Sequence, residues 1–260
     1  MTQQVHATAI VSSRADLTAD VEVGPYAVIG PEVEIGPGCK VGPHAVVEGP
    51  TRMGARNVIH PHAAIGRDPQ DRKFRPGEAS RLEIGDDNTI REFVTINRGT
   101  REGGGVTRVG NHCWLMASVH IAHDCILGDN VVMANFASLA GHVRVGSHVT
   151  MAGFSGAHQF CRIGDYGFVG IYAGITRDVP PYVLVAGQPP RPRGVNVIGL
   201  RRHGFTPIQR ANIERAYRTL YRKELSRAEA TEIIAEAAPE QPELAPMAEF
   251  LAEAGRGLLR

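Results

Sequence analysis

The sequence predicts an all-β solenoid, a left-handed parallel β-helix of hexapeptide repeats, followed by a small α-helical C-terminal domain. Two observations support this prediction: an aliphatic residue recurs at every sixth position through most of the chain, and helical signals begin only where that repeat stops. A period of six fits neither the 3.6-residue period of a helix nor the two-residue alternation of a long strand. It fits short strands joined by tight corners.

The repeat runs without a gap over residues 5–65, resumes over 84–96 and continues over 109–175. Of these 26 positions, 25 hold Val, Ile, Leu or Met, and the next residue is Gly in 12 cases and Ala in four. Three hexads make a triangular coil with aliphatic side chains inside, and successive coils stack roughly 4.8 Å apart. Small residues beside the aliphatic ones let the chain bend and let neighbouring backbones approach each other.

Two interruptions of the repeat, residues 66–83 and 97–108, are polar, basic and contain Gly or Pro. Insertions in a solenoid become loops, so both segments should project from the prism. Long loops on a rigid scaffold often carry function. The glycine run 103–105 is not followed by Lys and Ser or Thr, which excludes a P-loop and favours a flexible loop.

Beyond residue 175 a Pro-rich stretch, 178–196, is expected to be an extended linker that closes the coil stack. Thr206 followed by Pro207 predicts the start of a helix, and Ser226 with Glu229 forms a capping box for a second one. A third helix is expected from about 242 to 255. We therefore divide the chain into a β-helix over 1–190 and a linker with a helical domain over 191–260.

Charge is nearly balanced over the whole chain, at +1 with neutral His, which argues against a nucleic-acid partner. Residues 191–227, however, hold ten Lys or Arg and two Glu, a net charge of +8. Such a field suits an acidic partner or a phosphorylated ligand. A solvated basic face is the alternative.

Cellular location is indicated by the cysteines and the N-terminus. The four cysteines, Cys39, Cys113, Cys125 and Cys161, form no C-x-x-C pair, which favours free thiols in a reducing compartment. The first residues lack the basic and apolar regions of a signal peptide, and no run of about 18 apolar residues occurs. We expect a cytoplasmic protein without a membrane span.

The histidines concentrate in residues 120–158, whereas most of the others stand alone in their hexads. One coil after His123 comes position 141, and two coils after it comes position 159, next to His142 and His158. These three histidines should therefore lie along one edge in successive coils, with His120 close by. Imidazole titrates near neutrality, so the edge is a candidate catalytic site rather than a structural stack.

His123 is followed by Asp124, a pairing that indicates a general base and the carboxylate that orients it. Adjacent residues on a strand point to opposite faces, so direct contact requires a corner or another chain. Gly141, one coil away, could offer its N–H to an oxyanion. Neither G-x-S-x-G nor a Cys–His pairing occurs, so the nucleophile should be a substrate hydroxyl or amine. The histidine edge of a single prism cannot exclude water by itself. A second copy of the prism packed against it would, which predicts a homotrimer with sites between subunits.

Six motifs resemble, in order and spacing, those of the acyl-carrier-protein–UDP-N-acetylglucosamine O-acyltransferases that begin lipid A biosynthesis. They are HIAHDC (120–125), LAGHV (139–143), HQFC (158–161), DVPPYV (178–183), GVN (194–196) and GLRRHGF (199–205). The resemblance covers nearly the whole chain. It implies transfer of a (3-hydroxy)acyl chain from acyl carrier protein to the 3-hydroxyl of UDP-N-acetylglucosamine, without a covalent intermediate. The only carrier group implied is the acyl-phosphopantetheine of the donor; no cofactor or metal is implied.

The same resemblance implies roles for individual residues. His123 would be the general base, Asp124 its assistant, and the Gly141 N–H would face the thioester oxygen. Residues expected to bind substrate are Asp71, Lys73, His120, His142, His158, Gln159 and, at the uridine diphosphate end, Asn196 and Arg202. Ile171 stands where members that use long chains have Gly, so it should limit acyl length. Asn97, Ile198 and His203 depart from the family pattern and put the nucleotide contacts and the identity of the sugar in doubt.

Three other interpretations stay open at this point. An N-acyltransferase acting on a UDP-amino sugar would share the solenoid. Members of that group generally carry an additional N-terminal domain, whereas the hexads here begin at residue 5. A γ-type carbonic anhydrase would use three His on zinc in the same fold, and the histidine spacing here does not match. A scaffold without activity would need neither the histidine edge nor the basic segment.

Overall fold

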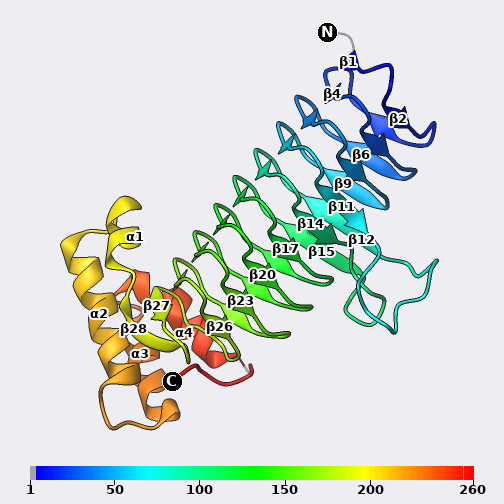
Figure 1. The fold of residues 1–260 in the computed structure, drawn as a ribbon. Coiled ribbons are helices and arrows are strands. Elements are labelled where there is room, and N and C mark those ends of the chain that lie inside the picture. The colour runs from blue at the N-terminus through cyan, green and yellow to red at the C-terminus, as the bar shows by residue number, and fades with distance from the viewer. Residues whose placement is uncertain (1–3, 254) are drawn as a thin grey trace.

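A computed structural model describes residues 4–253 and 255–260, and these residues wind into a triangular prism (Figure 1). Three sheets form the faces of the prism, and each coil contributes one strand to each sheet. Within the prism the strands pair in parallel with the strands one coil away. The N-terminus lies at one end and a group of helices at the other. The predicted left-handed parallel β-helix with a helical C-terminal end is confirmed.

The strands are short, and most have two residues. The first sheet contains β1 (Gln4–Val5), β4 (Glu22–Val23), β7 (Lys40–Val41), β10 (Val58–Ile59), β13 (Thr89–Ile90), β16 (Trp114–Leu115), β19 (Val132–Met133), β22 (Thr150–Met151), β25 (Phe168–Val169), β27 (Val183–Ala186) and β28 (Arg191–Val195). The second contains β2 (Ile10–Val11), β5 (Val28–Ile29), β8 (Val46–Val47), β11 (Ala64–Arg67), β14 (Thr95–Asn97), β17 (His120–Ile121), β20 (Ser138–Leu139), β23 (Gly156–Ala157) and β26 (Gly174–Ile175). The third contains β3 (Asp16–Leu17), β6 (Val33–Ile35), β9 (Thr51–Met53), β12 (Arg81–Ile84), β15 (Val106–Val109), β18 (Ile126–Leu127), β21 (Arg144–Val145) and β24 (Arg162–Ile163).

The aliphatic repeat fills the inside of the prism. In β17 and β20, Ile121 pairs with Leu139, and both side chains are fully buried. His120, the neighbour of Ile121, points outward because successive residues of a strand face opposite sides. Core and outer surface thus alternate along most strands, and the coil length of 18 residues follows from the register Ile121↔Leu139.

Corners between the sheets combine a close backbone approach with one left-handed residue. A Cβ atom at Gly24 would lie 2.9 Å from the backbone nitrogen of Pro43 in the next coil, so this position requires a glycine. The left-handed residue is not that glycine but Tyr26, two positions later, at φ 59°. His44, Asp124 and His142 occupy equivalent left-handed positions in other coils. The small residues therefore serve stacking, whereas the turn itself accepts other side chains.

Several buried polar groups of the prism are paired in a ladder along its axis. The Asn57 side chain accepts hydrogen bonds from the backbone and side chain of Asn88, whose own carbonyl oxygen accepts from the Cys113 N–H. Buried polar groups are tolerated when they are paired in this way. All four cysteines are buried and free, as predicted.

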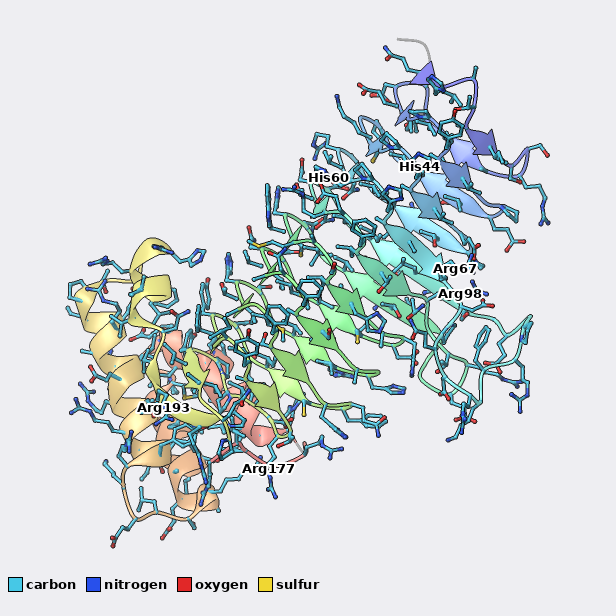
Figure 2. The ribbon with its side chains drawn as sticks, viewed as in Figure 1. His44, His60, Arg67, Arg98, Arg177 and Arg193 are labelled. Atoms are coloured by element: carbon cyan, nitrogen blue, oxygen red, sulfur yellow. The ribbon has the colours of Figure 1, made fainter. Side chains whose placement is uncertain are left out.

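Both predicted loops project from the prism, slightly shorter than expected because β11, β12, β14 and β15 extend into them (Figure 1). Arg98 ties the two loops together at their base, where Figure 2 shows it close to Arg67. Its guanidinium donates to the carbonyl of Gly66 at 3.1 Å and to the Ser80 hydroxyl at 3.1 Å, and it forms an ion pair with Asp68. The loops therefore form one connected unit beside the prism.

The Pro-rich stretch is extended, as predicted, but it ends in a hairpin rather than a free linker, because β27 and β28 pair antiparallel. The expected domain boundary at 190 falls inside this hairpin. The described residues that follow contain four helices and one 3₁₀ turn: α1 (Val197–Arg202), α2 (Pro207–Tyr221), α3 (Arg227–Ala237), η1 (Pro242–Leu244) and α4 (Ala245–Ala252). The predicted capping at Thr206 and Ser226 is present, whereas the short α1 was not predicted.

The helices form a second apolar cluster at the end of the prism. Leu200, Ile213, Leu220, Ile234 and Met247 are buried together there. Tyr182 connects the two parts, because its ring belongs to this cluster and its hydroxyl donates to the Glu243 carbonyl at 2.7 Å. Within the described residues, no helix has the length and apolar character needed to cross a membrane.

Candidate active site

The centre of the site is a corner between β17 and β18 that holds His123 and Asp124. Asp124 has a left-handed backbone, with φ 60°. The turn places both side chains on the same side of the chain, and Nδ1 of His123 lies 2.7 Å from Oδ2 of Asp124. The corner thus supplies the direct contact that a straight strand would prevent.

Asp124 is held by the second projecting loop. The Thr100 N–H donates to Oδ1 at 2.8 Å, and the Thr100 hydroxyl donates to Oδ2 at 2.6 Å. The Asp124 N–H in turn donates to the Thr107 hydroxyl at 2.8 Å. Neither Thr100 nor Thr107 was predicted from the sequence, although Asn97, three residues before Thr100, departs from the family pattern. No spacing rule relates position 100 to position 124, because the loop breaks the repeat.

These contacts fix the protonation of the pair. Burial alone would raise the pKa of Asp124, but hydrogen bonds from His123 and Thr100 outweigh it and lower the pKa below the usual value. An ionised carboxylate accepts hydrogen bonds and donates none, so Nδ1 of His123 must carry the proton. Nε2 is then the basic atom of the neutral ring.

Two further imidazoles surround this pair. The His142 ring meets His123 edge-on with centroids 5.1 Å apart, and its Nε2 lies 3.8 Å from Oδ2 of Asp124. Burial lowers the pKa of His142, although Asp124 partly opposes the shift. Burial, followed by the neighbouring His123, also lowers the pKa of His120, whose Nδ1 lies 2.7 Å from the Thr95 hydroxyl oxygen. Both rings are thereby kept neutral near pH 7.

Two glycines are required by close approach to the pair. A Cβ atom at Gly141 would lie 2.5 Å from Cε1 and 2.8 Å from Nε2 of His123. A Cβ atom at Gly103 would overlap the Asp124 carboxyl group. Among the described residues, none accepts a hydrogen bond from the Gly141 N–H, which leaves this donor free beside the basic nitrogen of His123.

His123 lies between two grooves. One runs over the second sheet with a volume of about 540 Å³, and its floor consists mostly of small or apolar residues, Ala122, Ala140, Gly156, Ala157 and Gly174 among them. The other, about 1470 Å³, lies over the third sheet, beneath the loops, and is strongly polar. Its lining includes Arg72, Lys73, Arg108, Arg144 and Arg256. An apolar chain and a charged group could therefore approach His123 from opposite sides.

The structure brings nine of the predicted residues to these grooves. His123 lines both grooves, whereas Gly141, His120 and His158 line the small-residue groove. Asp71, Lys73, Asp124, His142 and Gln159 line the polar groove. The Lys73 N–H donates to the Asp71 side chain at 2.9 Å, which shapes the loop at this point.

Three predicted residues lie outside both grooves of the chain. Asn196 caps α1, where its side chain accepts from the Gly199 N–H and donates to the Tyr166 carbonyl. Arg202 is exposed at the end of the same helix. Ile171 is 59% exposed on a corner between the first and second sheets, whereas His123 lies between the second and third. Their roles toward substrate stay predictions.

The sequence is similar to known proteins along its whole length. Residues 178–259 match the family model "Udp N-acetylglucosamine O-acyltransferase; Domain 2", and residues 19–49 and 107–141 match the bacterial transferase hexapeptide repeat. An acyl-[acyl-carrier-protein]–UDP-N-acetylglucosamine O-acyltransferase of Halorhodospira halophila is 53% identical over 99% of both chains. One from Xylella fastidiosa is 52% identical over 98% of this chain and 97% of its own. The chain belongs to this family of O-acyltransferases.

Solved structures of UDP-N-acetylglucosamine acyltransferases share the whole architecture. The enzyme from Moraxella catarrhalis superposes with a TM-score of 0.96 at 40% identity, covering 100% of both chains. The enzyme from Francisella novicida gives a TM-score of 0.96 at 39% identity, covering 99% of this chain and 94% of its own. The β-helix and its helical end are thus a family property.

Within this O-acyltransferase, His123, Asp124 and His142 are also a group that could hold a metal ion, because one ligand atom from each lies within 4.8 Å of the others. The existing contacts oppose such a use. Asp124 already accepts hydrogen bonds from His123 and from Thr100, and a metal on the same atoms would have to replace the bond between Nδ1 and Oδ2. The geometry is that of a hydrogen-bonded base.

The basic segment of the O-acyltransferase forms a surface around α2 and the β27–β28 hairpin. A pocket of about 370 Å³ there is lined by Arg191, Arg193, Arg222 and Lys223. Among the described residues, no Asp or Glu side chain pairs with these four cations, although Arg191 donates to the main-chain oxygen of Arg260 at 2.6 Å; Arg218, by contrast, pairs with Glu214 at 2.8 Å. The hairpin side of α2 therefore presents positive charge without acidic side chains to pair with it.

Proposed function

We propose that this protein transfers a (3-hydroxy)acyl chain from acyl carrier protein to the 3-hydroxyl of UDP-N-acetylglucosamine, the first step of lipid A biosynthesis. The observation that supports it most directly is the His123–Asp124 pair. Thr100 of the second loop fixes this pair, which lies between the small-residue groove and the polar groove. Full-length identity to acyltransferases of that name supports the choice of donor and acceptor.

In the proposed reaction, Nε2 of neutral His123 takes the proton of the sugar 3-hydroxyl while the hydroxyl oxygen attacks the thioester carbonyl carbon. Asp124 stabilises the imidazolium that forms, and the Gly141 N–H donates to the oxyanion. The tetrahedral intermediate then collapses, the C–S bond breaks, and the proton on Nε2 passes to the departing pantetheine sulfur. One ester replaces one thioester, and no covalent enzyme intermediate or cofactor is needed.

The grooves suit the two substrates. The floor of the small-residue groove offers room and few polar groups, which fits an acyl chain, with His120 and His158 at its sides. The polar groove carries Lys73, Arg144 and Arg256, which fits the anionic sugar nucleotide, with Asp71, His142 and Gln159 near the sugar. Asn196 and Arg202 would complete the nucleotide contacts.

The basic surface around α2 supports the choice of an acidic acyl donor. Acyl carrier proteins are acidic, and the uncompensated cations around Arg222 and Lys223 offer electrostatic steering toward such a partner. Both grooves are open to solvent in one chain, so a homotrimer would provide the second wall. We infer that the reaction takes place in the cytoplasm, because four free cysteines are typical of a reducing compartment.

A direct assay tests the proposal. Purified protein is offered UDP-N-acetylglucosamine with a panel of acyl carrier proteins bearing different chains, and the product is analysed by mass spectrometry. We expect a UDP-sugar heavier by one acyl group, with the ester on the 3-hydroxyl. The 3-amino analogue serves as a second acceptor, because preference for it would identify an N-acyltransferase. A chelator should leave the rate unchanged; loss of activity on chelation, or no transfer to either sugar, would contradict the proposal.

A further inference from the structure

We propose that Thr100 is a positioning residue that sets the orientation of the catalytic base by clamping Asp124 from the second projecting loop. The inference rests on the proposed role of His123 and extends the site beyond the β-helix. Asp124 accepts hydrogen bonds from Thr100, a loop residue 24 positions before it. The orientation of the base therefore depends on a segment outside the repeat.

The clamp uses both donors of one residue. The Thr100 N–H reaches Oδ1 of Asp124 at 2.8 Å, and its hydroxyl reaches Oδ2 at 2.6 Å. Two bonds to the two oxygens fix the plane of the carboxylate, which one bond would not do. The Asp124 side chain is only 1% exposed, so water cannot replace a lost donor there.

Oδ2 is the critical atom, because it accepts from the Thr100 hydroxyl and from Nδ1 of His123. The Gly103 N–H donates to the Thr100 hydroxyl oxygen at 3.1 Å, which orients the hydroxyl proton toward Asp124. A chain of hydrogen bonds therefore runs from Gly103 through Thr100 and Asp124 to His123. Linked bonds of this kind strengthen one another in a buried site.

Gly103 also supplies the space for the clamp. A Cβ atom at this position would overlap the Asp124 carboxyl group, so the loop can pack here only without a side chain. The Gly105 N–H donates to the Thr100 carbonyl at 2.8 Å and closes the turn. The glycine run 103–105 thus has a local purpose: it lets the loop close over the carboxylate.

The loop reaches this position from a fixed base. Arg98, two residues before Thr100, bonds to Gly66 and Ser80 and pairs with Asp68 of the first loop. Thr100 itself is buried, at 6% exposure. A rotation of the His123 ring would move Nε2 away from the sugar hydroxyl, and displacements of about 1 Å can cost on the order of 100-fold in rate.

The test replaces Thr100 by Val, which keeps the N–H and the shape but removes the hydroxyl. We expect kcat to fall roughly 10- to 100-fold while KM for UDP-N-acetylglucosamine changes less than about threefold. Thr100→Ser keeps the hydroxyl and should retain activity within about threefold. Thr51→Val is the matched control: Thr51 is also buried, its hydroxyl donates to the Glu48 carbonyl and not to Asp124, and its strand β9 lies three strands from β18 in the third sheet.

A double-mutant cycle separates positioning from folding. If Thr100 acts through Asp124, Thr100→Val should cost little in an Asp124→Asn background, less than about twofold. An undiminished loss in that background, or a Thr100→Val enzyme with half or more of the parental kcat, would overturn the inference. Should Thr100→Val fail to fold by circular dichroism, Gly103→Ala decides: its Cβ would overlap the Asp124 carboxyl group, so Asp124 and the loop that carries Thr100 must move apart although the hydroxyl itself is kept. Parental kcat in that variant rejects the clamp.

Failure of the inference and failure of the proposed function give different results. If His123→Ala retains activity, the general-base mechanism itself is wrong. If His123→Ala is inactive and Thr100→Val is not impaired, the mechanism stands and only the clamp is rejected. The same assay of acyl transfer to UDP-N-acetylglucosamine reports both outcomes.

Discussion

Nδ1 of His123 lies 2.7 Å from Oδ2 of Asp124, although the two residues are neighbours in the chain. The contact exists because Asp124 adopts the left-handed conformation of a β-helix corner. The side chain of His123 is 14% exposed and that of Asp124 1%, so the imidazole is accessible from the grooves while the carboxylate is shielded from solvent behind it. The corner thus forms a hydrogen-bonded imidazole–carboxylate pair from two consecutive residues.

Replacement of His123 by Ala should lower kcat by at least about 100-fold, because it removes the base proposed to take the proton of the sugar hydroxyl. The fold should persist, since His123 contributes nothing to the interior of the prism. Acyl transfer and circular dichroism are measured together. His62→Ala, which removes an exposed corner histidine stacked on Phe93, is the control and should retain its rate. Near-parental turnover in His123→Ala would refute the general-base role.

Much of this site was predictable because the coil repeat converts sequence spacing into distance. Steps of 18 residues placed Gly141 and His142 beside His123, and the structure has them in contact. The Thr100 contact was not predictable, because the loop interrupts the repeat and its path depends on Arg98 and on packing. Side-chain partners supplied by irregular segments carry no periodic signal.

The same distinction holds for the fold. Strands and core positions follow from the hexads because every coil repeats the same contacts, as with Ile121 and Leu139. Helix starts at Thr206 and Ser226 follow from local capping chemistry. The β27–β28 hairpin and α1 were not predicted, because Pro-rich extended chain looks the same whether or not it pairs and because α1 has only six residues.

The native mass should be that of three chains, about 84 kDa from 28.0 kDa each. The reason is that both grooves beside His123 are open in one chain, and a second prism is the simplest wall that excludes water. Analytical ultracentrifugation at assay concentration measures this directly. An active species sedimenting as a monomer would contradict a site shared between chains.

Stability should decline as the pH falls below about 6.5, before the carboxylates titrate. Burial lowers the pKa of His120, His142 and His148 in the folded protein, from an ordinary value of 6.5. Between the folded and unfolded pKa values the unfolded chain binds more protons, so stability is complete above about 6.5 and is lost as the pH falls through this window. Chemical unfolding from pH 7.5 to about 5 measures the slope.

His148→Phe provides the matched test of that slope. The aromatic ring can still stack on Tyr166, where the His148 ring lies 4.6 Å away, but it cannot take up a proton. The pH dependence of unfolding should become shallower in this variant, while the stability at pH 8 changes less. An unchanged slope would mean that His148 does not contribute to the linkage.

Charge reversal at Arg222 and Lys223 should raise KM for the acyl carrier protein and flatten its dependence on salt. Both cations line the pocket beside α2 and have no acidic partner among the described ion pairs. KM for the sugar nucleotide should change little. Reversal of Arg14 and Arg52, exposed cations at the other end of the prism, makes the same change in net charge and serves as the control. Equal salt dependence in both double variants would assign the basic surface to another purpose.

The last prediction concerns Ile171, at a corner after β25. Together with Phe154 and Tyr172, whose rings stack at 5.2 Å, it belongs to an exposed apolar edge of the second sheet, across that sheet from His123. The small-residue groove runs along the same sheet to Ile175 and Thr176, so an acyl chain that crosses the sheet, or a partner's edge packed over it, would meet this side chain. Packed interiors do not yield space for several methylenes, each of which contributes about 0.8 kcal/mol when buried. We therefore expect a preference for donors of about ten to twelve carbons over about fourteen, and Ile171→Gly should shift the preference to the longer chain.

The control for this prediction is Ile10→Gly. Ile10 is an exposed isoleucine of the second sheet at the opposite end of the prism, so its replacement should leave the chain-length preference unchanged. If a panel of acyl carrier protein donors gives the parental profile with Ile171→Gly, another residue limits the chain.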